Sequence, residues 1–337
     1  MTQPPPSPVR FFETIIGYQR TAALKAAVEL SLFTAIGAGN RSVAALAERC
    51  SASERGVRIL CDYLVIVGFL TKSGAEYGLT TDSATFLDRK SPAYIGAATD
   101  FIASPALIEL FLADPAEIVR RGGTLLGEGS VSADNPLWVA FARAMAPLVA
   151  QRAGDVAALA DDGAGQPIKV LDIAAGHGLF GIAIAKRNSH AEITALDWDA
   201  VLDVARENAA AAGIASRFRT IAGSAFDVAF GGPYDVVLLT NFLHHFDAAT
   251  CETLLRKVHA ALVPDGRAVT LEFVPDEDRV TPPGAAAFSF VMLGSTRAGD
   301  AYTFAEYRRM FEAAGFADLA LHELPPTDER VVTARRA

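Results

Sequence analysis

A short apolar strand that runs into a turn of small residues constrains this chain more than any other feature. The strand and turn form the segment VLDIAAGHG of residues 170–178, and a helical pattern follows over residues 179–186. Consecutive apolar side chains, several of them β-branched, are typical of a parallel strand buried on both faces. Gly176 and Gly178 let a ligand approach the backbone, and the next helix presents unpaired N–H groups at its N-terminus.

A carboxylate follows a second predicted strand at a spacing that suits a nucleoside. This strand covers residues 191–196 and ends in Asp197, 25 residues after Asp172. A carboxylate at that position can accept hydrogen bonds from both ribose hydroxyls. The pattern therefore predicts a site for a dinucleotide or for S-adenosylmethionine, with an ordinary strand-to-helix turn as the alternative.

The composition of the turn favours the methyl donor over a dinucleotide. A dinucleotide fingerprint has the form G-x-G-x-x-G, whereas position 174 is alanine. Asp172 at the end of the strand would also repel a pyrophosphate. S-adenosylmethionine has no phosphate, and its ammonium group can be held by acidic and carbonyl groups.

The C-terminal half repeats the order strand, turn, helix and strand. This order predicts a doubly wound, Rossmann-like parallel sheet whose ligands lie beyond the carboxyl ends of the strands. The further predicted elements are strands over 234–239 and 267–273, a helix ending at 262, a Pro-Gly turn over 263–266, a helix over 302–315 and a final pair of strands ending near 333.

On these motifs the chain resembles the class I S-adenosylmethionine-dependent methyltransferases, and within them the small-molecule O-methyltransferases of plants and bacteria. In that family a histidine that begins a His-Asp-Trp-like segment is the general base, and a glutamate at the end of the next strand orients it. His244, in the segment TNFLHHFD of residues 240–247, and Glu272, 28 residues later, match these positions. The pairing suits the chemistry, because imidazole titrates near neutrality and a carboxylate on its second nitrogen fixes the tautomer.

The resemblance also implies a set of residues that hold S-adenosylmethionine. The turn from Asp172 is expected to hold the methionine part of the donor, and Asp197 the ribose. The full set is Asp172, Ala174, Gly176, Gly178, Asp197, Trp198, Ser224, Ala225, Phe226, Thr240 and Asn241.

Four positions depart from the family pattern. Ala301 stands where the family often has a second supporting glutamate, and His245 stands where it commonly has aspartate. Ser224 replaces an acidic residue near the adenine, and Thr240 replaces a lysine-like position near the donor. These changes leave open which atom of the acceptor is methylated.

The acceptor pocket implied by the resemblance is aromatic and rich in methionine, which suits a flat, apolar acceptor held by dispersion. The alternative for each of these side chains is ordinary packing in the core. The predicted acceptor residues are Phe141, Met145, His245, Phe288, Met292 and Thr296.

Metal binding is not expected. His244, His245, Asp247 and His259 are suitable ligand types, but no His-x-x-x-His spacing occurs, and removal of a methyl group from a sulfonium requires no metal. The three cysteines at positions 50, 61 and 251 are too scattered for a disulfide framework or a zinc cluster, which indicates a reducing cytoplasm.

The N-terminal part predicts a mostly helical, winged-helix-like domain after a proline-rich tail over residues 1–8. The pattern is a long amphipathic helix over 11–32, a short segment to residue 37, helices capped by Ser42 and Ser53, and a hairpin over 68–79.

DNA binding by this domain is not expected, because the recognition-helix position offers only Arg55 and Arg58 as cations beside Asp62, and the chain has a formal net charge of −9. In the resembled family the domain forms a homodimer. The apolar stripe of residues 11–32 suits that role, and a helix of the domain's own core is the alternative.

Three regions are expected along the chain: a dimerisation domain over 1–90, a helical linker that contributes to the acceptor pocket over 91–155, and the catalytic domain over 156–337. Helices are predicted over 91–112 and 136–149, with an exposed glycine-rich loop over 122–129 between them. The longest apolar run is shorter than the ~18 residues of a membrane span, so a cytoplasmic enzyme is expected.

The sequence therefore predicts a homodimeric, metal-independent methyltransferase that acts on a hydroxyl of a small aromatic or conjugated acceptor. An N-, S- or C-methyltransferase that works by proximity is the nearest alternative. A nicotinamide-dependent oxidoreductase is more distant, and a donor-binding dimer without activity also fits Ala301. Neither nucleic acid nor a membrane is expected as a partner.

Overall fold

The computed structural model describes residues 6–126 and 137–337, which fall into two compact units, residues 1–108 and 109–337. The boundary between them lies inside the region predicted as a linker. No helix of the described residues is both long enough and apolar enough to cross a membrane.

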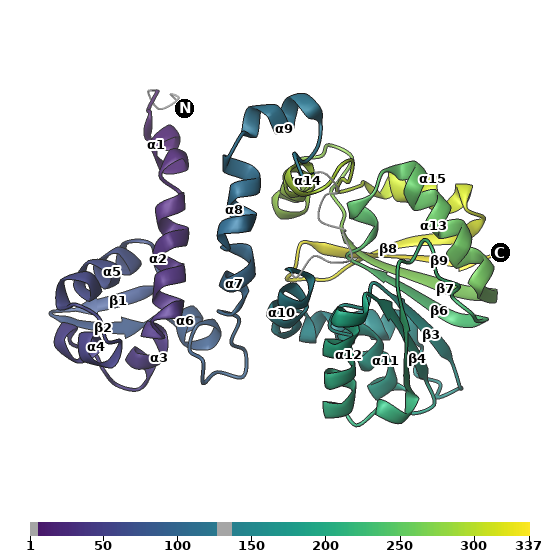
Figure 1. The fold of residues 1–337 in the computed structure, drawn as a ribbon, viewed down its shortest axis with the longest axis horizontal. Helices are drawn as coiled ribbons and strands as arrows, with labels where there is room; N and C mark the ends of the chain where they lie inside the picture. The colour runs from purple at the N-terminus through teal and green to yellow at the C-terminus, as the bar shows by residue number, and fades with distance from the viewer. Residues whose placement is uncertain (1–5, 127–136) are drawn as a thin grey trace, which may run out of the picture. The chain divides into compact units, whose positions relative to one another are not determined.

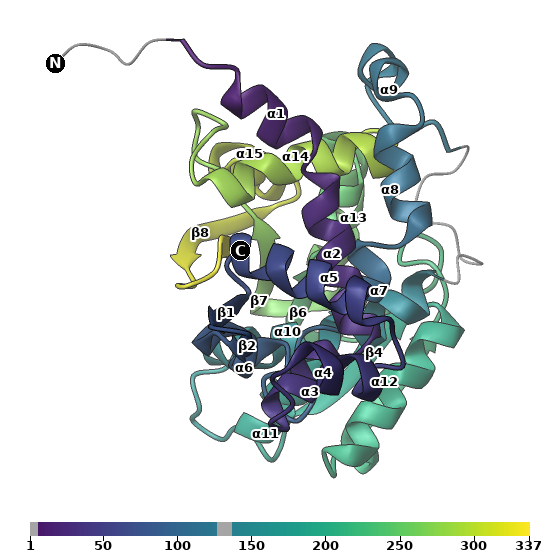
Figure 2. The same cartoon turned by 90° about the vertical axis from the view of Figure 1, so that its left-hand side faces the viewer.

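In the N-terminal unit a two-stranded hairpin packs against short helices (Figure 2). Ser42 and Ser53 cap two of the helices as predicted, because their hydroxyls accept hydrogen bonds from the backbone N–H groups of Ala45 at 3.3 Å and Gly56 at 3.1 Å. The elements are α1 (Val9–Ile15), α2 (Tyr18–Glu29), α3 (Leu32–Gly37), α4 (Val43–Arg49), α5 (Glu54–Ile66), β1 (Leu70–Ser73), β2 (Glu76–Leu79), α6 (Thr81–Phe86) and α7 (Ala98–Ile102).

The predicted single helix over 11–32 is wrong, since the chain forms α1 and α2 there and bends before α3. The first break lies at Gly17, whose N–H bonds to the carbonyl three residues earlier, and the second at Ser31, which has a left-handed φ of +53°. Residues 91–97 are also not helical, so the predicted helix over 91–112 is reduced to α7 and α8 (Pro105–Leu112).

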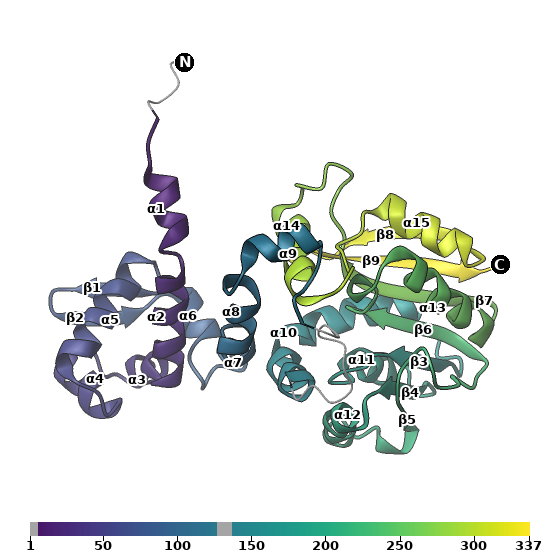
Figure 3. The same ribbon diagram turned by 45° about the horizontal axis from the view of Figure 1, so that its top comes forward.

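The C-terminal unit is built on a seven-stranded sheet of order β5-β4-β3-β6-β7-β9-β8. The first five strands in this order are parallel, and β9 and β8 complete the sheet as antiparallel strands (Figure 3). This is the predicted doubly wound α/β class. The strands are β3 (Lys169–Ile173), β4 (Glu192–Asp197), β5 (Phe218–Ala222), β6 (Tyr234–Thr240), β7 (Leu262–Phe273), β8 (Phe316–Glu323) and β9 (Glu329–Arg336).

Helices cover both faces of the sheet (Figure 1). Alternate side chains of β6 separate the two cores: Val236 and Leu238 pack with α10, α11 and α12, while Val237 and Leu239 pack with α13 and α15. The helices are α9 (Pro115–Arg121), α10 (Leu137–Ala160), α11 (Leu179–Arg187), α12 (Asp199–Ala211), α13 (Ala248–Ala261), α14 (Pro283–Ser295) and α15 (Phe304–Ala313).

Two local predictions for this unit need correction. The turn predicted over 263–266 is a bulge inside the long strand β7, where Asp265 has a φ of +61° and the register with β6 shifts. The loop predicted as exposed over 122–129 is partly buried, because the N–H of Thr124 donates to the carbonyl of Thr296 at 2.8 Å. Residues 127–129 of that loop and residue 136 of the next predicted helix lie outside the described residues.

Candidate active site

The turn after β3 has the tight backbone that its small residues predicted. Ala174, Gly176 and Gly178 have φ values of +54°, +56° and +73°. A Cβ atom on Gly178 would lie 3.0 Å from the Cβ of Ala205, so glycine is needed there for both conformation and space. The chain therefore crosses the carboxyl edge of the sheet in a tight turn and enters α11 directly.

Asp172, at the end of β3, is a buried carboxylate with one oxygen unused. Its Oδ2 accepts a hydrogen bond from the N–H of Gly181 at 3.1 Å, while its Oδ1 has no partner among the described residues. Burial raises the pKa of Asp172 to about 7, and the nearby charge of Asp197 adds to the shift. A buried, unpaired acceptor of this kind suits a ligand that brings a positive charge or a hydrogen-bond donor.

Asp197, at the end of β4, ties the neighbouring strand to the turn. Its Oδ2 accepts from the N–H of Gly176 at 2.8 Å and its Oδ1 from the N–H of Trp198 at 2.7 Å. Burial raises the pKa of Asp197 to about 6. Both oxygens are thus held by backbone donors, and each retains acceptor capacity for a hydroxyl.

The loop after β5 carries three of the predicted donor residues next to Asp197, and Ser224 is the one expected near the adenine. The N–H of Gly223 donates to the carbonyl of Asp197 at 2.9 Å, and the N–H of Phe226 donates to the hydroxyl of Ser224 at 3.2 Å. Ala225 is buried in the loop. The loop is therefore joined to the same strand end as the predicted ribose carboxylate.

The end of β6 completes this edge of the sheet. Thr240 is buried, and Asn241 has a φ of +52° with its N–H bonded to the carbonyl of Leu271 at 2.8 Å. The side-chain amide of Asn241 donates to Glu329 at 3.2 Å, whereas its Oδ1 is buried without a partner in the described part of the chain.

Sequence reasoning did not identify the two residues that support Asn241. Glu329, a buried residue of β9, forms an ion pair with Arg152 of α10 in addition to its bond with Asn241. Their positions lie almost 180 residues apart, and neither belongs to a local motif. A charged residue inside the apolar pattern of α10 was the only available signal.

His244 and Glu272 lie in contact, as the family pattern implied. His244 is in a 3-10 helix, η3 (Leu243–His245), and its Nδ1 bonds to Oε2 of Glu272 at the end of β7. The other carboxylate oxygen, Oε1, accepts from the N–H groups of Phe242 at 3.0 Å and Leu243 at 2.8 Å. Both side chains are buried, so Glu272 holds the imidazole and its short helix in one orientation.

Aromatic rings surround this histidine. The ring of Phe288 lies edge-on at 4.9 Å from that of His244 and stacks on Phe273 at 4.1 Å. The ring of His245 lies 4.4 Å from that of His244 and meets Trp138 edge-on at 5.6 Å. Burial holds the pKa of His245 well below its usual range, and the nearby imidazole of His244 adds to the shift. A positive charge on His245 is therefore disfavoured.

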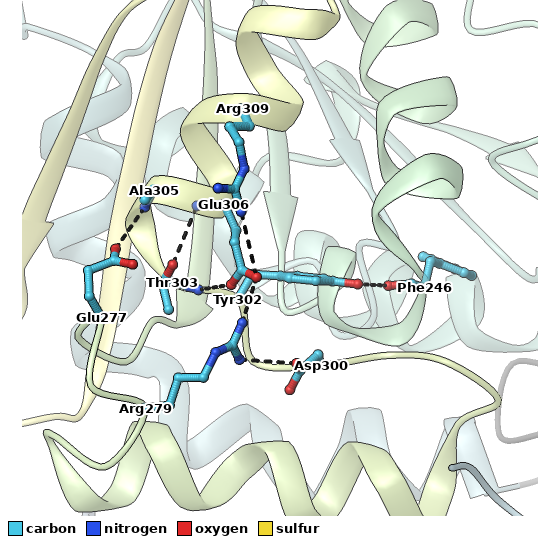
Figure 4. A network of polar contacts seen from close by, with 9 residues as sticks. All are labelled: Phe246, Glu277, Arg279, Asp300, Tyr302, Thr303, Ala305, Glu306 and Arg309. Atoms are coloured by element: carbon cyan, nitrogen blue, oxygen red, sulfur yellow. Dashed lines mark hydrogen bonds and ion pairs between the residues drawn. The ribbon is translucent and has the colours of Figure 1, made fainter. Parts of the chain in front are cut away.

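The segment over residues 296–303 lies against the backbone of η3. A Cβ atom on Gly299 would be 2.1 Å from the carbonyl oxygen of His244, and the hydroxyl of Tyr302 donates to the carbonyl of Phe246 at 2.7 Å. Arg279 holds the segment in place through Asp300 at 3.2 Å and Glu306 at 2.5 Å (Figure 4). Ala301, where the family often has glutamate, is fully buried within it.

The remaining acceptor residues are only partly brought together. Phe141 packs edge-on against Trp138 at 5.6 Å, and Met145 is half-buried on the same helix, α10. Met292 is buried on α14. Thr296 has a local role, because its hydroxyl donates to the carbonyl of Met292 at 2.7 Å and accepts from the N–H of Gly299 at 2.9 Å.

Within residues 6–126 and 137–337 the structure contains no group of three or more side chains that could hold a metal ion. His259 lies elsewhere, with its ring packed edge-on against Phe316 at 5.2 Å. His177, in the turn, accepts from the N–H of Leu179 at 3.1 Å, so its ring caps the start of α11. The thiols of the three cysteines are free and buried.

Two family models match most of the chain. A model described as an O-methyltransferase domain matches residues 140–317, and one described as an O-methyltransferase dimerisation domain matches residues 12–89.

Individual relatives cover nearly the full length. The crystal structure of a proposed O-methyltransferase from Nostoc punctiforme PCC 73102 is 54% identical, with a TM-score of 0.94 over 98% of this chain and 100% of that one. The 3-hydroxy-5-methyl-1-naphthoate 3-O-methyltransferase of Streptomyces sahachiroi is 26% identical over 93% of this chain and 90% of that protein. The acetylserotonin O-methyltransferase of Mus musculus molossinus is 28% identical over 90% of this chain and 82% of that protein.

Proposed function

The chain belongs to the O-methyltransferase family, and from this premise we propose that it transfers a methyl group from S-adenosylmethionine to a hydroxyl of a small aromatic acceptor. The observation that carries the proposal is the buried pair of His244 and Glu272 at the sheet edge that also holds Asp172 and Asp197. The Streptomyces and mouse relatives, which are named for methylation of a naphthoate and of acetylserotonin, support an aromatic acceptor.

The residues at the carboxyl edge of the sheet fit the proposed donor. S-adenosylmethionine supplies an electrophilic methyl group on a positively charged sulfur. Asp172 and Asn241 each offer a buried oxygen without a partner in the described chain, which suits the ammonium of the methionine part. Asp197 has free acceptor capacity for the ribose hydroxyls, and we assign the adenine to the loop from Ser224 to Phe226, which is bonded to the same strand end.

His244 acts as the general base in this proposal. Glu272 accepts a hydrogen bond from Nδ1–H of His244, which fixes the neutral tautomer with a lone pair on Nε2. Nε2 then takes the proton of the acceptor hydroxyl while the hydroxyl oxygen bonds to the methyl carbon and the bond between that carbon and the sulfur of the donor breaks. The bonding pair stays on sulfur, S-adenosylhomocysteine leaves as a neutral thioether, and Glu272 stabilises the resulting imidazolium. The buried setting keeps water away from this pair and strengthens the interaction between them.

The surroundings of His244 favour a flat and largely apolar acceptor. Phe288 and Trp138 present ring edges and faces on two sides of the histidines. His245 adds one polar group beside these rings, so a flat aromatic or conjugated compound with a hydroxyl fits these surroundings.

We further propose a homodimer formed by the N-terminal unit. The match to a dimerisation domain supports it, as do the exposed Phe11, Phe12 and Ile15 on α1, a helix without a buried residue. The free cysteines suit a reducing compartment, and we place the enzyme in the cytoplasm.

A methyl-transfer assay with labelled S-adenosylmethionine and a panel of phenols and enols tests the proposed function. We expect His244→Ala to lower kcat by about 10²-fold or more, with donor affinity within about twofold of wild type. His190→Ala, which removes an exposed imidazole, is the matched control and should be fully active. Undiminished turnover by His244→Ala would point instead to proximity catalysis on a nitrogen, sulfur or carbon atom.

A further inference from the structure

One lysine outside the predicted site has all three of its N–H donors engaged by a single loop. Nζ of Lys257, on α13, donates to the backbone carbonyls of Ala225 at 2.8 Å, Phe226 at 3.0 Å and Val228 at 2.7 Å. An ammonium group has three donors, so these bonds use its full capacity. The three carbonyls come from a stretch of four residues, which must turn around the cation in one conformation.

The surroundings of the cation fix its position. Nζ lies 4.4 Å from the ring centroid of Phe230, whose side chain is buried. Leu254 and Val258, neighbours of Lys257 on α13, are buried in the core against the sheet. Lys257 therefore extends from a rigid helix, and its charge-assisted bonds are stronger than neutral hydrogen bonds would be.

The loop that Lys257 holds is the one placed for the adenine. At its start the N–H of Gly223 donates to the carbonyl of Asp197 at 2.9 Å, next to the predicted ribose carboxylate. Its side facing α13 is fixed by Lys257, and the ring of Phe226 packs edge-on at 5.0 Å against that of Phe246.

The same helix also adjoins the proposed base. α13 begins just after η3, where the side chain of Asp247 caps it by accepting from the N–H of Thr250 at 2.7 Å. The adenine loop is thus bonded to α13, and His244 lies in the segment that leads directly into the same helix. α13 is therefore a fixed support for the loop.

We propose that Lys257 is a positioning residue for the methyl donor, which holds the loop of residues 224–228 in the shape that binds adenine. This inference rests on the proposed use of S-adenosylmethionine. Lys257 does not touch the donor in this account. It acts through the backbone carbonyls of the loop, and its loss affects the donor and leaves the acceptor pocket intact.

Lys257→Met tests this role, because methionine keeps an unbranched apolar stem, one atom shorter than lysine, and removes the three donors. The matched control is Lys186→Met, which replaces an exposed lysine near the end of α11. Calorimetry with S-adenosylhomocysteine and with its hypoxanthine analogue, S-inosylhomocysteine, measures affinity and discrimination between bases. Steady-state kinetics measures the KM of each substrate separately.

We expect Lys257→Met to weaken S-adenosylhomocysteine binding by about tenfold or more, and the inosyl analogue by much less, so that discrimination between the bases collapses. The KM of the acceptor and kcat at saturating donor should stay within about twofold. Lys257→Arg keeps the charge, but its planar fork cannot reach all three carbonyls, so it should restore part of the affinity. If the methionine variant does not fold, the arginine variant carries the same test against wild type.

A purely structural lysine would weaken both analogues equally and leave discrimination unchanged, which would overturn the proposal. Wild-type affinity in Lys257→Met would overturn it as well, while binding of S-adenosylhomocysteine by the wild type would still support the proposed function. Failure of the wild type to bind S-adenosylhomocysteine would overturn the proposed function itself, and the role of Lys257 with it.

Discussion

The buried carboxylate of Asp172 should lower the unfolding free energy of the donor-free protein at pH 8, relative to a variant without this charge. Its side chain is fully buried, one oxygen has no partner among the described residues, and burial raises its pKa from 3.8 to about 7. Because the folded-state pKa is raised, protonated Asp172 favours the folded state, and this contribution is lost as the pH rises from about 4 through 7. A shift of roughly three units corresponds to about 4 kcal/mol of unfolding free energy.

Asp172→Asn removes this charge and keeps the bond to Gly181, because the amide oxygen can still accept from that N–H. The buried NH₂ group lacks a partner, which costs about 1–3 kcal/mol. At pH 8 we therefore expect a net gain of about 1–3 kcal/mol in unfolding free energy for the variant. At pH 4 the wild type is protonated at Asp172 in the folded state, and the variant should be equally stable or less stable.

Urea unfolding followed by tryptophan fluorescence measures this effect. The chain has two tryptophans, Trp138 and Trp198, and both belong to the C-terminal unit, so the signal reports the unit that holds Asp172. Asp155→Asn, on the exposed side of α10, is the control and should show the same difference from wild type at every pH. A stability difference for Asp172→Asn that does not change between pH 4 and 8 would show that burial of the Asp172 charge does not destabilise the fold.

Two further predictions concern the proposed base. In Glu272→Gln the side-chain oxygen still accepts from the N–H groups of Phe242 and Leu243, but an amide donor faces Nδ1 of His244, so the imidazole proton moves to Nε2. Initial rates at saturating donor should therefore fall about 10²-fold or more. An active variant would exclude this role of Glu272. Gly299→Ala places a Cβ 2.1 Å from the carbonyl oxygen of His244, so kcat should drop at least about tenfold. The control Gly154→Ala has open space around its Cβ, and it should stay active and gain about 0.5–1 kcal/mol in stability. Equal activity of the two variants would argue against support of the base by residues 296–303.

The parts of the fold that depend on local pattern could be predicted from the sequence. The apolar run of β3, the small residues of the turn and the caps Ser42 and Ser53 are local features, and the structure confirms each of them. The contact between His244 and Glu272 was also found, through the resemblance to a family with that pair. Their chemical roles remain predictions.

The features that sequence reasoning missed depend on contacts between distant residues. Thr124, in the loop predicted as exposed, is buried because its N–H donates to the carbonyl of Thr296. No local pattern reveals this contact. The ion pair of Arg152 and Glu329 joins α10 to β9, the last strand of the chain. Lys257 bonds to a loop about 30 residues earlier in the sequence. In each case the role of the residue follows from its partner, and the partner is fixed only by the fold.

The break in the predicted helix over residues 11–32 has a different cause. Gly17 and Ser31 are tolerated in helices, and the apolar pattern continues across both positions, so periodicity alone favours one helix. In the structure Gly17 makes a tighter turn and Ser31 adopts a left-handed conformation, which lets α3 pack with α4 and β2 in its own core. Packing thus outweighed a weak local preference.

Calorimetric titration of the purified wild-type chain with S-adenosylmethionine, S-adenosylhomocysteine and NADH, in parallel, tests whether the sheet edge binds a methyl donor. We predict saturable binding of the first two ligands in the micromolar range and no response to NADH. Binding of NADH alone would contradict it, and would make the sheet edge around Asp172 and Asp197 a dinucleotide site.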